Sequence, residues 1–167
     1  MKSILLTGGS GFIGTNLLNS LKDKFKIYVL KRRNNKKRSI YINKNIFIVN
    51  YKNLNEIEHL VYKKKINYFI NLATHYSNQN DSSNLLKIIE SNILFPSMVL
   101  NSINKKYLKK VISIGSMHEH FKGKHFTPYN FYAASKKAFS VITKFYKFKH
   151  SQIKFYNLKF YETFSEN

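Results

Sequence analysis

Tyr132 and Lys136 are candidate catalytic residues because of their types and their spacing. They are four residues apart, so on a helix they share one face. A nearby ammonium group stabilises a phenolate and lowers the pKa of a tyrosine from its usual value of about 10. Tyr132 can then exchange a proton with a hydroxyl or carbonyl group near neutral pH. We therefore predict that Tyr132 is a general acid or base.

Ser116 is the third candidate catalytic residue. It directly follows the apolar run Val111–Gly115, which places it at the carboxyl edge of a parallel sheet, where ligands bind. Its hydroxyl can hold the same substrate oxygen as Tyr132. A Tyr-x-x-x-Lys spacing alone occurs by chance in a chain so rich in both residues. Ser116, 16 residues before Tyr132, makes chance a poor explanation.

Three glycines near the N-terminus, Gly8, Gly11 and Gly14, follow an apolar run and begin an amphipathic one. In a strand–loop–helix unit the first glycine permits a tight turn and the second lets the backbone approach a pyrophosphate. The third allows close packing of helix on strand. The helix N-terminus then offers free N–H groups to phosphates. We predict a dinucleotide-binding loop, with Phe12 and Ile13 also beside the cofactor, rather than a merely structural turn.

Positive charge follows the second expected strand, about 20 residues past this loop. An acid there would hydrogen-bond the adenosine ribose of NAD, but the sequence has Lys31, Arg32 and Arg33. Cations suit the 2′-phosphate of NADP, and the planar fork of arginine matches phosphate oxygens. The sequence thus favours NADP(H) and leaves NAD(H) open. The alternative interpretation is a solvated basic loop.

The elements that must position these residues alternate along the whole chain. Apolar residues recur every three or four positions in 12–22, 53–64, 83–104 and 130–149, which predicts helices. Short runs rich in β-branched and aromatic residues predict strands at Ser3–Thr7, Lys26–Leu30, Asn45–Val49, Tyr68–Asn71, Lys110–Ile114 and Gln152–Leu158. This alternation predicts one α/β domain over residues 1–167, a doubly wound parallel sheet of about six strands with helices on both faces.

Two finer expectations concern the helices. Asn53 and Ser83 are of residue types that cap helix N-termini. In 130–149 one apolar stripe is expected to form a continuous face, made of Phe131, Ala134, Ala138, Val141, Ile142 and Phe145.

The chain is strongly basic, with 29 Lys and Arg against 8 Asp and Glu and a net charge of +21. Such a balance alone suggests a nucleic-acid binder, which would bind DNA or RNA with a steep salt dependence. However, the basic residues are spread along the chain, and Lys, Asn, Ile, Phe and Tyr, all encoded by A/T-rich codons, are abundant together. We attribute the lysines to base composition and expect no nucleic-acid ligand.

Other classes are excluded by what the sequence lacks. It has no cysteine, hence no disulfide or thiolate site. Its apolar runs are far shorter than the roughly 20 residues that span a bilayer, and the first comes too early for a secretory leader. We therefore expect no membrane insertion and a cytoplasmic location. His118 and His120 imply no third ligand, so we expect no metal; His118 and His75 are candidates for lining a substrate pocket.

The motifs resemble those of the extended short-chain dehydrogenase/reductases, the NAD(P)-dependent nucleotide-sugar epimerase/dehydratase family. The resemblance rests on the glycine loop and on the Ser/Tyr/Lys set, and it covers nearly the whole chain. It implies a Rossmann-type sheet in the order 3-2-1-4-5-6. It also implies that Tyr132 is the general acid, that Ser116 orients the substrate and that Lys136 also holds the nicotinamide ribose. By the same resemblance Leu72, Ala73 and Asn92 line the cofactor site.

Within that family, the segments Ile114–Phe121 and Pro128–Phe139 resemble the CDP-abequose and CDP-paratose synthases. Those enzymes use NADPH to reduce the 4-keto group of a CDP-linked dideoxyhexose. The resemblance therefore implies reduction of a nucleotide-linked 4-keto-deoxysugar, with Tyr132 as the proton donor. Met117 and His118 stand where dehydratases typically carry acids, which favours reduction over dehydration.

Two alternatives remain at this point. An NAD-dependent epimerase or dehydratase would share the loop, the tyrosine and the lysine. A non-catalytic dinucleotide-binding fragment is the alternative from another class, because relatives continue beyond the sixth expected strand into a C-terminal substrate domain that we expect to be absent here. The sequence is then expected to be a fragment, a truncated gene product or one half of a split gene, and in the last case the missing half is a separate chain. Relatives often form homodimers through the helices that carry Asn92 and Tyr132.

Overall fold

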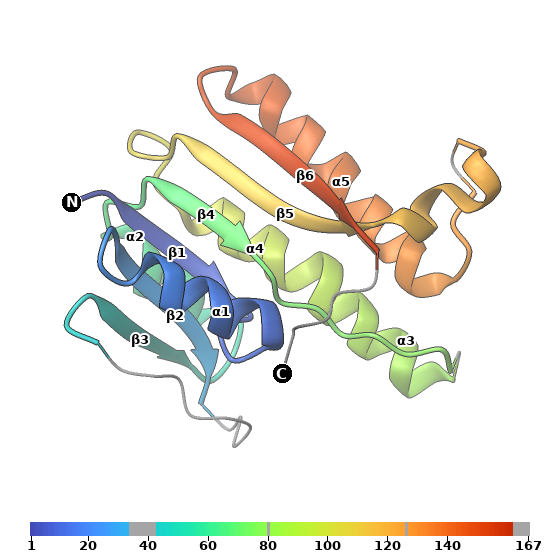
Figure 1. Cartoon of the computed structure of the whole chain (residues 1–167), viewed down its shortest axis with the longest axis horizontal. Coiled ribbons are helices and arrows are strands. Elements are labelled where there is room, and N and C mark those ends of the chain that lie inside the picture. The colour runs from blue at the N-terminus through green and yellow to red at the C-terminus, as the bar shows by residue number, and fades with distance from the viewer. Residues whose placement is uncertain (34–42, 80, 126, 162–167) are drawn as a thin grey trace.

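The computed structural model describes residues 1–33, 43–79, 81–125 and 127–161. Six strands form one parallel sheet in the order β3-β2-β1-β4-β5-β6 (Figure 1). Their bounds are β1 Ser3–Thr7, β2 Lys26–Arg32, β3 Ile46–Tyr51, β4 Tyr68–Asn71, β5 Lys110–Ser116 and β6 Lys154–Phe160. The predicted α/β class and strand order are confirmed, and the sheet is of the Rossmann type.

Helices cover both faces of this sheet. Helix α1 (Phe12–Leu21) lies on one face, and α2 (Glu56–Tyr62), α4 (Phe95–Ser102) and α5 (Phe131–Lys149) lie on the other (Figure 1). Two further elements approach the carboxyl edge, α3 (Ser82–Ile89) and the 3₁₀ segment η2 (Met117–Gly123). Within the described ranges, none of the helices is both long and apolar enough to cross a membrane.

The expected helix 83–104 is interrupted by a π-helical turn, η1 (Glu90–Leu94), between α3 and α4. Pro96 at the start of α4 has no N–H to donate back to residue 92, so regular α-helical bonding cannot run through this point. Such π-turns occur frequently at functional sites. This one carries Asn92 on its inner side, where the residue is buried.

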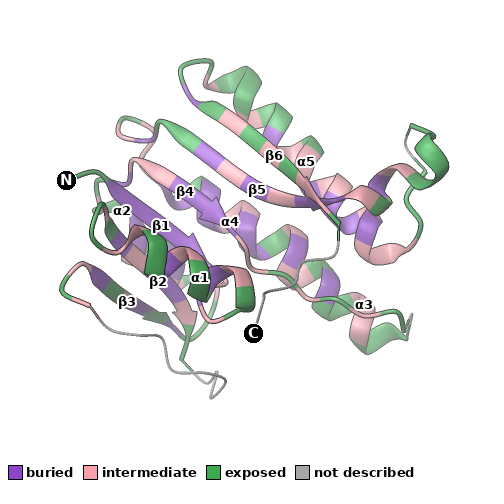
Figure 2. Cartoon of the chain, in the orientation of Figure 1, coloured by how far each residue is buried: buried purple, intermediate pink, exposed green. Residues whose placement is uncertain are grey.

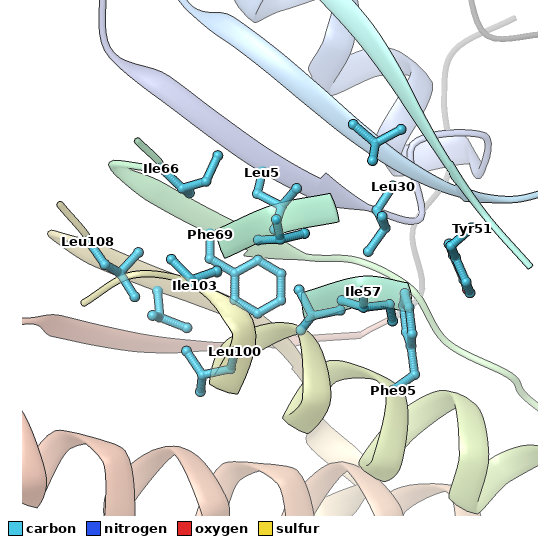
Figure 3. Close-up of a cluster of buried hydrophobic side chains, with 14 of the residues drawn as sticks. Leu5, Leu30, Tyr51, Ile57, Ile66, Phe69, Phe95, Leu100, Ile103 and Leu108 are labelled. Atoms are coloured by element: carbon cyan, nitrogen blue, oxygen red, sulfur yellow. The ribbon is translucent and has the colours of Figure 1, made fainter. Parts of the chain in front are cut away.

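The core consists of two clusters, one on each face of the sheet. The larger packs Leu5, Phe69 and Val111 of the strands against α2 and α4 (Figure 3). The smaller packs Ile4, Leu6 and Ile70 against α1. Burial is complete along β1 and falls toward β6, whose residues are exposed or half-buried (Figure 2).

The cap at the start of α3 differs from expectation. Asp81, not Ser83, caps this helix: its carboxylate accepts hydrogen bonds from the backbone N–H groups of Ser83 and Asn84, both at 3.1 Å. Asn53 does receive the N–H groups of Asn55 and Glu56, at 3.1 and 3.3 Å, just before α2 begins.

The apolar stripe expected along α5 exists as a sequence pattern, but none of its members is buried. The helix turns a face of smaller and more polar residues toward the protein: Ala133, Ser135, Lys136, Phe139 and Thr143. The stripe lies on the half-buried and outward sides instead, with Val141 and Phe145 about half exposed. Placing Lys136 inward requires this rotation of the helix.

Candidate active site

The glycine loop joins β1 to α1 in a turn that only glycine fits. Gly8 has φ +71°, and a Cβ there would lie 2.6 Å from the backbone nitrogen of Ala73. A Cβ on Gly14 would lie 2.3 Å from the carbonyl oxygen of Gly8, so the helix is in direct contact with the loop. No side chain caps α1 at Gly11, and its first turn has no acid. The helix N-terminus is therefore electrostatically suited to an anion.

A cavity of about 650 Å³ opens over this loop, a size typical of ligand sites. Six of the predicted cofactor-binding residues line it: Gly8, Gly11, Lys31, Arg32, Leu72 and Ala73. An elongated phosphorylated ligand fits the combination of glycine backbone, helix N-terminus and cations. The other predicted cofactor-binding residues lie nearby without lining this cavity: Phe12, Ile13, Gly14, Arg33, Asn92, Tyr132 and Lys136.

Leu72 and Ala73 are placed by a link between β1 and β4. The hydroxyl of Thr7 donates to the side-chain oxygen of Asn71 at 2.6 Å and accepts from the backbone N–H of Ala73 at 3.3 Å. Both Thr7 and Asn71 are buried. This link holds the segment after β4 against Gly8, where it forms the floor of the cavity.

Asn92 acts on the site through the backbone of His75. Its amide oxygen accepts from the N–H of His75 at 2.8 Å, and its amide nitrogen donates to the carbonyl of His75 at 3.0 Å. Its side chain also accepts a hydrogen bond from the hydroxyl of Thr74 at 3.1 Å and donates one to the hydroxyl of Ser135 at 2.9 Å. Asn92 thus ties the loop after β4 to α5, the helix that carries Tyr132 and Lys136.

A second cavity, of about 470 Å³, brings the candidate catalytic residues together. Ser116 reaches it from the end of β5, His118 from η2, and Tyr132 and Lys136 from the first turns of α5. Leu72 and Thr74 line both cavities, so the two adjoin. His75, predicted to bind substrate, lines the larger cavity, and its Nε2 atom is buried without a hydrogen-bond partner.

Burial is the main cause of the pKa shifts of Lys136 and Tyr132 on α5. Burial lowers the pKa of Lys136 from 10.5 to about 8, and Glu119 counteracts this in part. Burial also raises the pKa of Tyr132 above 10.0, and a hydrogen bond with Thr74 opposes that rise. The lowered tyrosine pKa expected from the sequence is therefore not found in this structure. The ammonium of Lys136 lies 5.6 Å from the centre of the Tyr132 ring and is itself poorly solvated.

Glu119 is fully buried beneath Ser116. Its carboxylate accepts from the backbone N–H of Ser116 at 2.8 Å and pairs with the ammonium of Lys159 on β6. The Ser116 hydroxyl in turn accepts from the N–H of His118 at 3.2 Å, and with the backbone N–H of Glu119 it completes a capping box. The Ser-x-x-Glu spacing is a sequence signal for this arrangement that our sequence analysis missed.

Among the residues of the larger cavity that the sequence did not predict are Tyr51, Lys87 and Glu90. Glu90 accepts a hydrogen bond from Arg32, 58 residues earlier in the chain. A contact across that separation leaves no local pattern. Among the described residues, no group of three or more His, Asp or Glu side chains is arranged to hold a metal ion.

Comparison with known proteins agrees with this geometry. The model of the NAD dependent epimerase/dehydratase family matches residues 4–167. The chain belongs to this family. A curated member, CDP-abequose synthase from Salmonella muenchen, is 30% identical over 167 residues, which are 99% of this chain and 54% of that protein. The chain therefore spans about half the length of the relatives it matches.

Solved structures of epimerase/dehydratase enzymes show the same fold. UDP-N-acetylglucosamine 4-epimerase from Methanobrevibacter ruminantium M1 matches with a TM-score of 0.80 and 22% identity, over 98% of this chain and 56% of that one. The UDP-Glc/GlcNAc 4-epimerase from Campylobacter jejuni matches with a TM-score of 0.82 and 17% identity, over 95% and 53%. At these identities the likeness concerns the fold.

Proposed function

We propose that this chain forms the NADP(H)-binding and catalytic part of a reductase that acts on a nucleotide-linked 4-keto-deoxysugar. The observation that carries the proposal is the pair of adjoining cavities. One combines the glycine loop with cations, and the other contains Ser116, Tyr132 and Lys136. A dinucleotide bound across the shared wall of Leu72 and Thr74 would bring its nicotinamide to the catalytic residues.

The residues of the smaller cavity suit carbonyl reduction. The bound nicotinamide supplies the hydride that adds to the carbonyl carbon. Tyr132, which burial keeps protonated at neutral pH, donates its hydroxyl proton to the carbonyl oxygen, and the product is a hydroxyl group. The ammonium of Lys136 stabilises the phenolate left on Tyr132. The hydroxyl of Ser116 hydrogen-bonds the same substrate oxygen and orients it.

Two observations favour reduction over the reactions of other members. A curated relative that matches 99% of this chain is CDP-abequose synthase, and Met117 and His118 follow Ser116 where dehydratases typically carry acids. Lys31 and Arg32 on the cavity wall favour NADPH over NADH. A cytoplasmic enzyme with a soluble nucleotide-sugar substrate follows from the same proposal.

The test is a fluorescence titration with NADPH and with NADH at moderate salt, followed by an assay with a CDP-linked 4-keto-deoxyhexose. We expect saturable binding that is tighter for NADPH and weaker in the Arg32→Gln variant. The Tyr132→Phe variant should retain cofactor binding and lose NADPH consumption. If a folded chain binds neither cofactor, the proposal is wrong. If it binds NADPH but Tyr132→Phe changes nothing, the chain is a binding module rather than a catalyst.

We also propose that the chain forms a homodimer through the outward side of α5 together with α3. Large apolar side chains are exposed there, including Leu86 on α3 and Val141, Phe145 and Phe148 on α5. Phe148 is 89% exposed and lies three and seven residues after Phe145 and Val141, so the three side chains share one face of α5, and an exposed apolar patch marks an interaction site. Sedimentation should show a dimer that the Phe145→Glu variant dissociates.

A further inference from the structure

An ion pair on the wall of the larger cavity is not explained by the phosphate loop or by the catalytic residues. The guanidinium of Arg32, at the end of β2, donates a hydrogen bond to the carboxylate of Glu90, at the start of η1. Both residues line the cavity. About half of each side chain is exposed, 49% for Arg32 and 44% for Glu90. The pair therefore faces the space that a ligand would enter.

The neighbours of this pair fix its position and its charge. Arg32 lies over the ring of Tyr51, with its guanidinium carbon 6.0 Å from the ring centre. Tyr51 is buried and stacks on Phe95 at 5.5 Å, so it is a rigid support. The hydrogen bond to Glu90 raises the pKa of Arg32, which is offset in part by burial. Arg32 is thus a fixed cation whose charge is already matched by a carboxylate.

The remaining charged residues of the cavity wall are cations. Lys31 on β2 and Lys87 on α3 line the cavity together with Arg32, and Glu90 is the acid among the described lining residues. An arginine held by a carboxylate offers fewer free N–H donors to a second anion. Glu90 is therefore placed to reduce what Arg32 contributes to phosphate binding.

We propose that Glu90 is a specificity-determining residue, which holds Arg32 and so weakens the preference for a 2′-phosphorylated dinucleotide over the unphosphorylated one. The inference rests on the proposed dinucleotide-binding function. A 2′-phosphate engages Arg32 only by sharing it with Glu90 or displacing Glu90. NADH has no such phosphate, so its affinity depends little on the pair. Wild-type chain should thus accept both cofactors with a modest preference for NADPH.

Removal of the carboxylate should strengthen that preference. In Glu90→Gln the ratio of NADPH to NADH affinity should rise roughly threefold to tenfold, because the pair is half exposed and its interactions are screened by solvent and salt. In Arg32→Gln the ratio should fall toward one. In the double variant Arg32→Gln/Glu90→Gln it should equal the ratio of Arg32→Gln, because Glu90 acts through Arg32.

The experiment measures the dissociation constants of NADPH and NADH for the wild type and these three variants by fluorescence titration. Glu58→Gln is the matched control, since it removes the same charge from an exposed position on α2 outside the cavity lining. Urea unfolding verifies that every variant is folded.

Three outcomes overturn the inference. If Glu90→Gln leaves the ratio unchanged, or changes it no more than Glu58→Gln does, Glu90 has no role in specificity. If Glu90→Gln still raises the ratio in the Arg32→Gln background, Glu90 repels the phosphate directly rather than through Arg32. If the folded wild type binds neither cofactor, the proposed function itself fails, which is distinguishable from the first two results.

Discussion

The buried ammonium of Lys136 should make the folded chain less stable at neutral pH than a variant without it. Lys136 is 7% exposed, and burial lowers its pKa from 10.5 to about 8. At about 1.4 kcal/mol for each tenfold change in proton affinity, that difference corresponds to roughly 3 kcal/mol. The charged form is destabilised by this amount in the folded chain. We therefore expect Lys136→Met to raise the free energy of unfolding by about 1–3 kcal/mol near pH 7.

The pH dependence of this gain has a definite sign. Below pH about 8 both folded and unfolded chains hold the proton on Lys136, so the full penalty applies. Between about 8 and 10.5 the folded chain has released the proton while the unfolded chain retains it, so wild-type stability rises with pH. Above 10.5 neither state is charged at this site. The advantage of Lys136→Met should therefore shrink steadily as the pH rises through this window.

The assay is urea unfolding of the cofactor-free wild type and variant at several pH values from about 7 to about 10.5. Lys144→Met is the control, because Lys144 is an exposed lysine two turns later on the same helix. It reports what a lysine-to-methionine change does without burial. A Lys136→Met variant that is less stable than wild type at neutral pH, or whose difference from wild type does not depend on pH, would show that Lys136 is not a destabilising buried cation.

Three further changes test the scaffold of the site. Gly8→Ala should lower the free energy of unfolding, measured with urea, by more than about 3 kcal/mol, because the left-handed backbone disfavours alanine and the added Cβ would clash with the backbone. Gly123→Ala should lower it by only about 1–2 kcal/mol, because Gly123 has a φ of +72° but a Cβ there would have no atom within 4 Å. Equal losses would show that the clash is relieved by a small shift. Asn92→Ala should lose about 2–4 kcal/mol by the same measurement, since it leaves the N–H and carbonyl of His75 without their partners. A loss below about 1 kcal/mol would mean that water replaces the amide. The pH range over which stability rises should begin below about 8 in Glu119→Gln, because the charge of Glu119 raises the pKa of Lys136. An unchanged pH range would contradict this.

Much of the fold could be predicted because the deciding signals are local. β1 and β4 have the predicted bounds, and the ends of the other strands differ from the prediction by at most two residues. Alternation of apolar runs with amphipathic stretches is sufficient for that. The glycine loop could be predicted equally well. At position 8 the φ is +71° and an added Cβ would lie 2.6 Å from a backbone atom, so glycine is the residue that fits.

Tertiary contacts determine the features that could not be predicted from the sequence. The apolar stripe of α5 predicted a continuous face, yet the helix buries Lys136 and Thr143 instead. Counting hydrophobic residues cannot detect that a helix is rotated to bring a catalytic side chain inward. Similarly, Lys31, Arg32 and Arg33 were predicted as one phosphate-binding group. The structure places Lys31 and Arg32 on the cavity wall, whereas Arg33 lies outside the lining and donates its backbone N–H to Tyr51 at 2.8 Å, so a cofactor contact of Arg33 stays a prediction.

Three features that lower the stability of this chain lie at the carboxyl edge of its sheet. Gly8 has a left-handed backbone, Asn92 sits in a π-turn, and Lys136 is a buried cation. Each lowers stability relative to a regular alternative. A chain selected only to fold could avoid the left-handed turn, the π-turn and the buried cation, whereas the proposed dinucleotide site beside Tyr132 uses all three. Their joint presence around two adjoining cavities favours the proposed catalytic chain over a passive binding module, because holding a nicotinamide ribose explains Lys136 but gives no reason to place Tyr132 and Ser116 beside it.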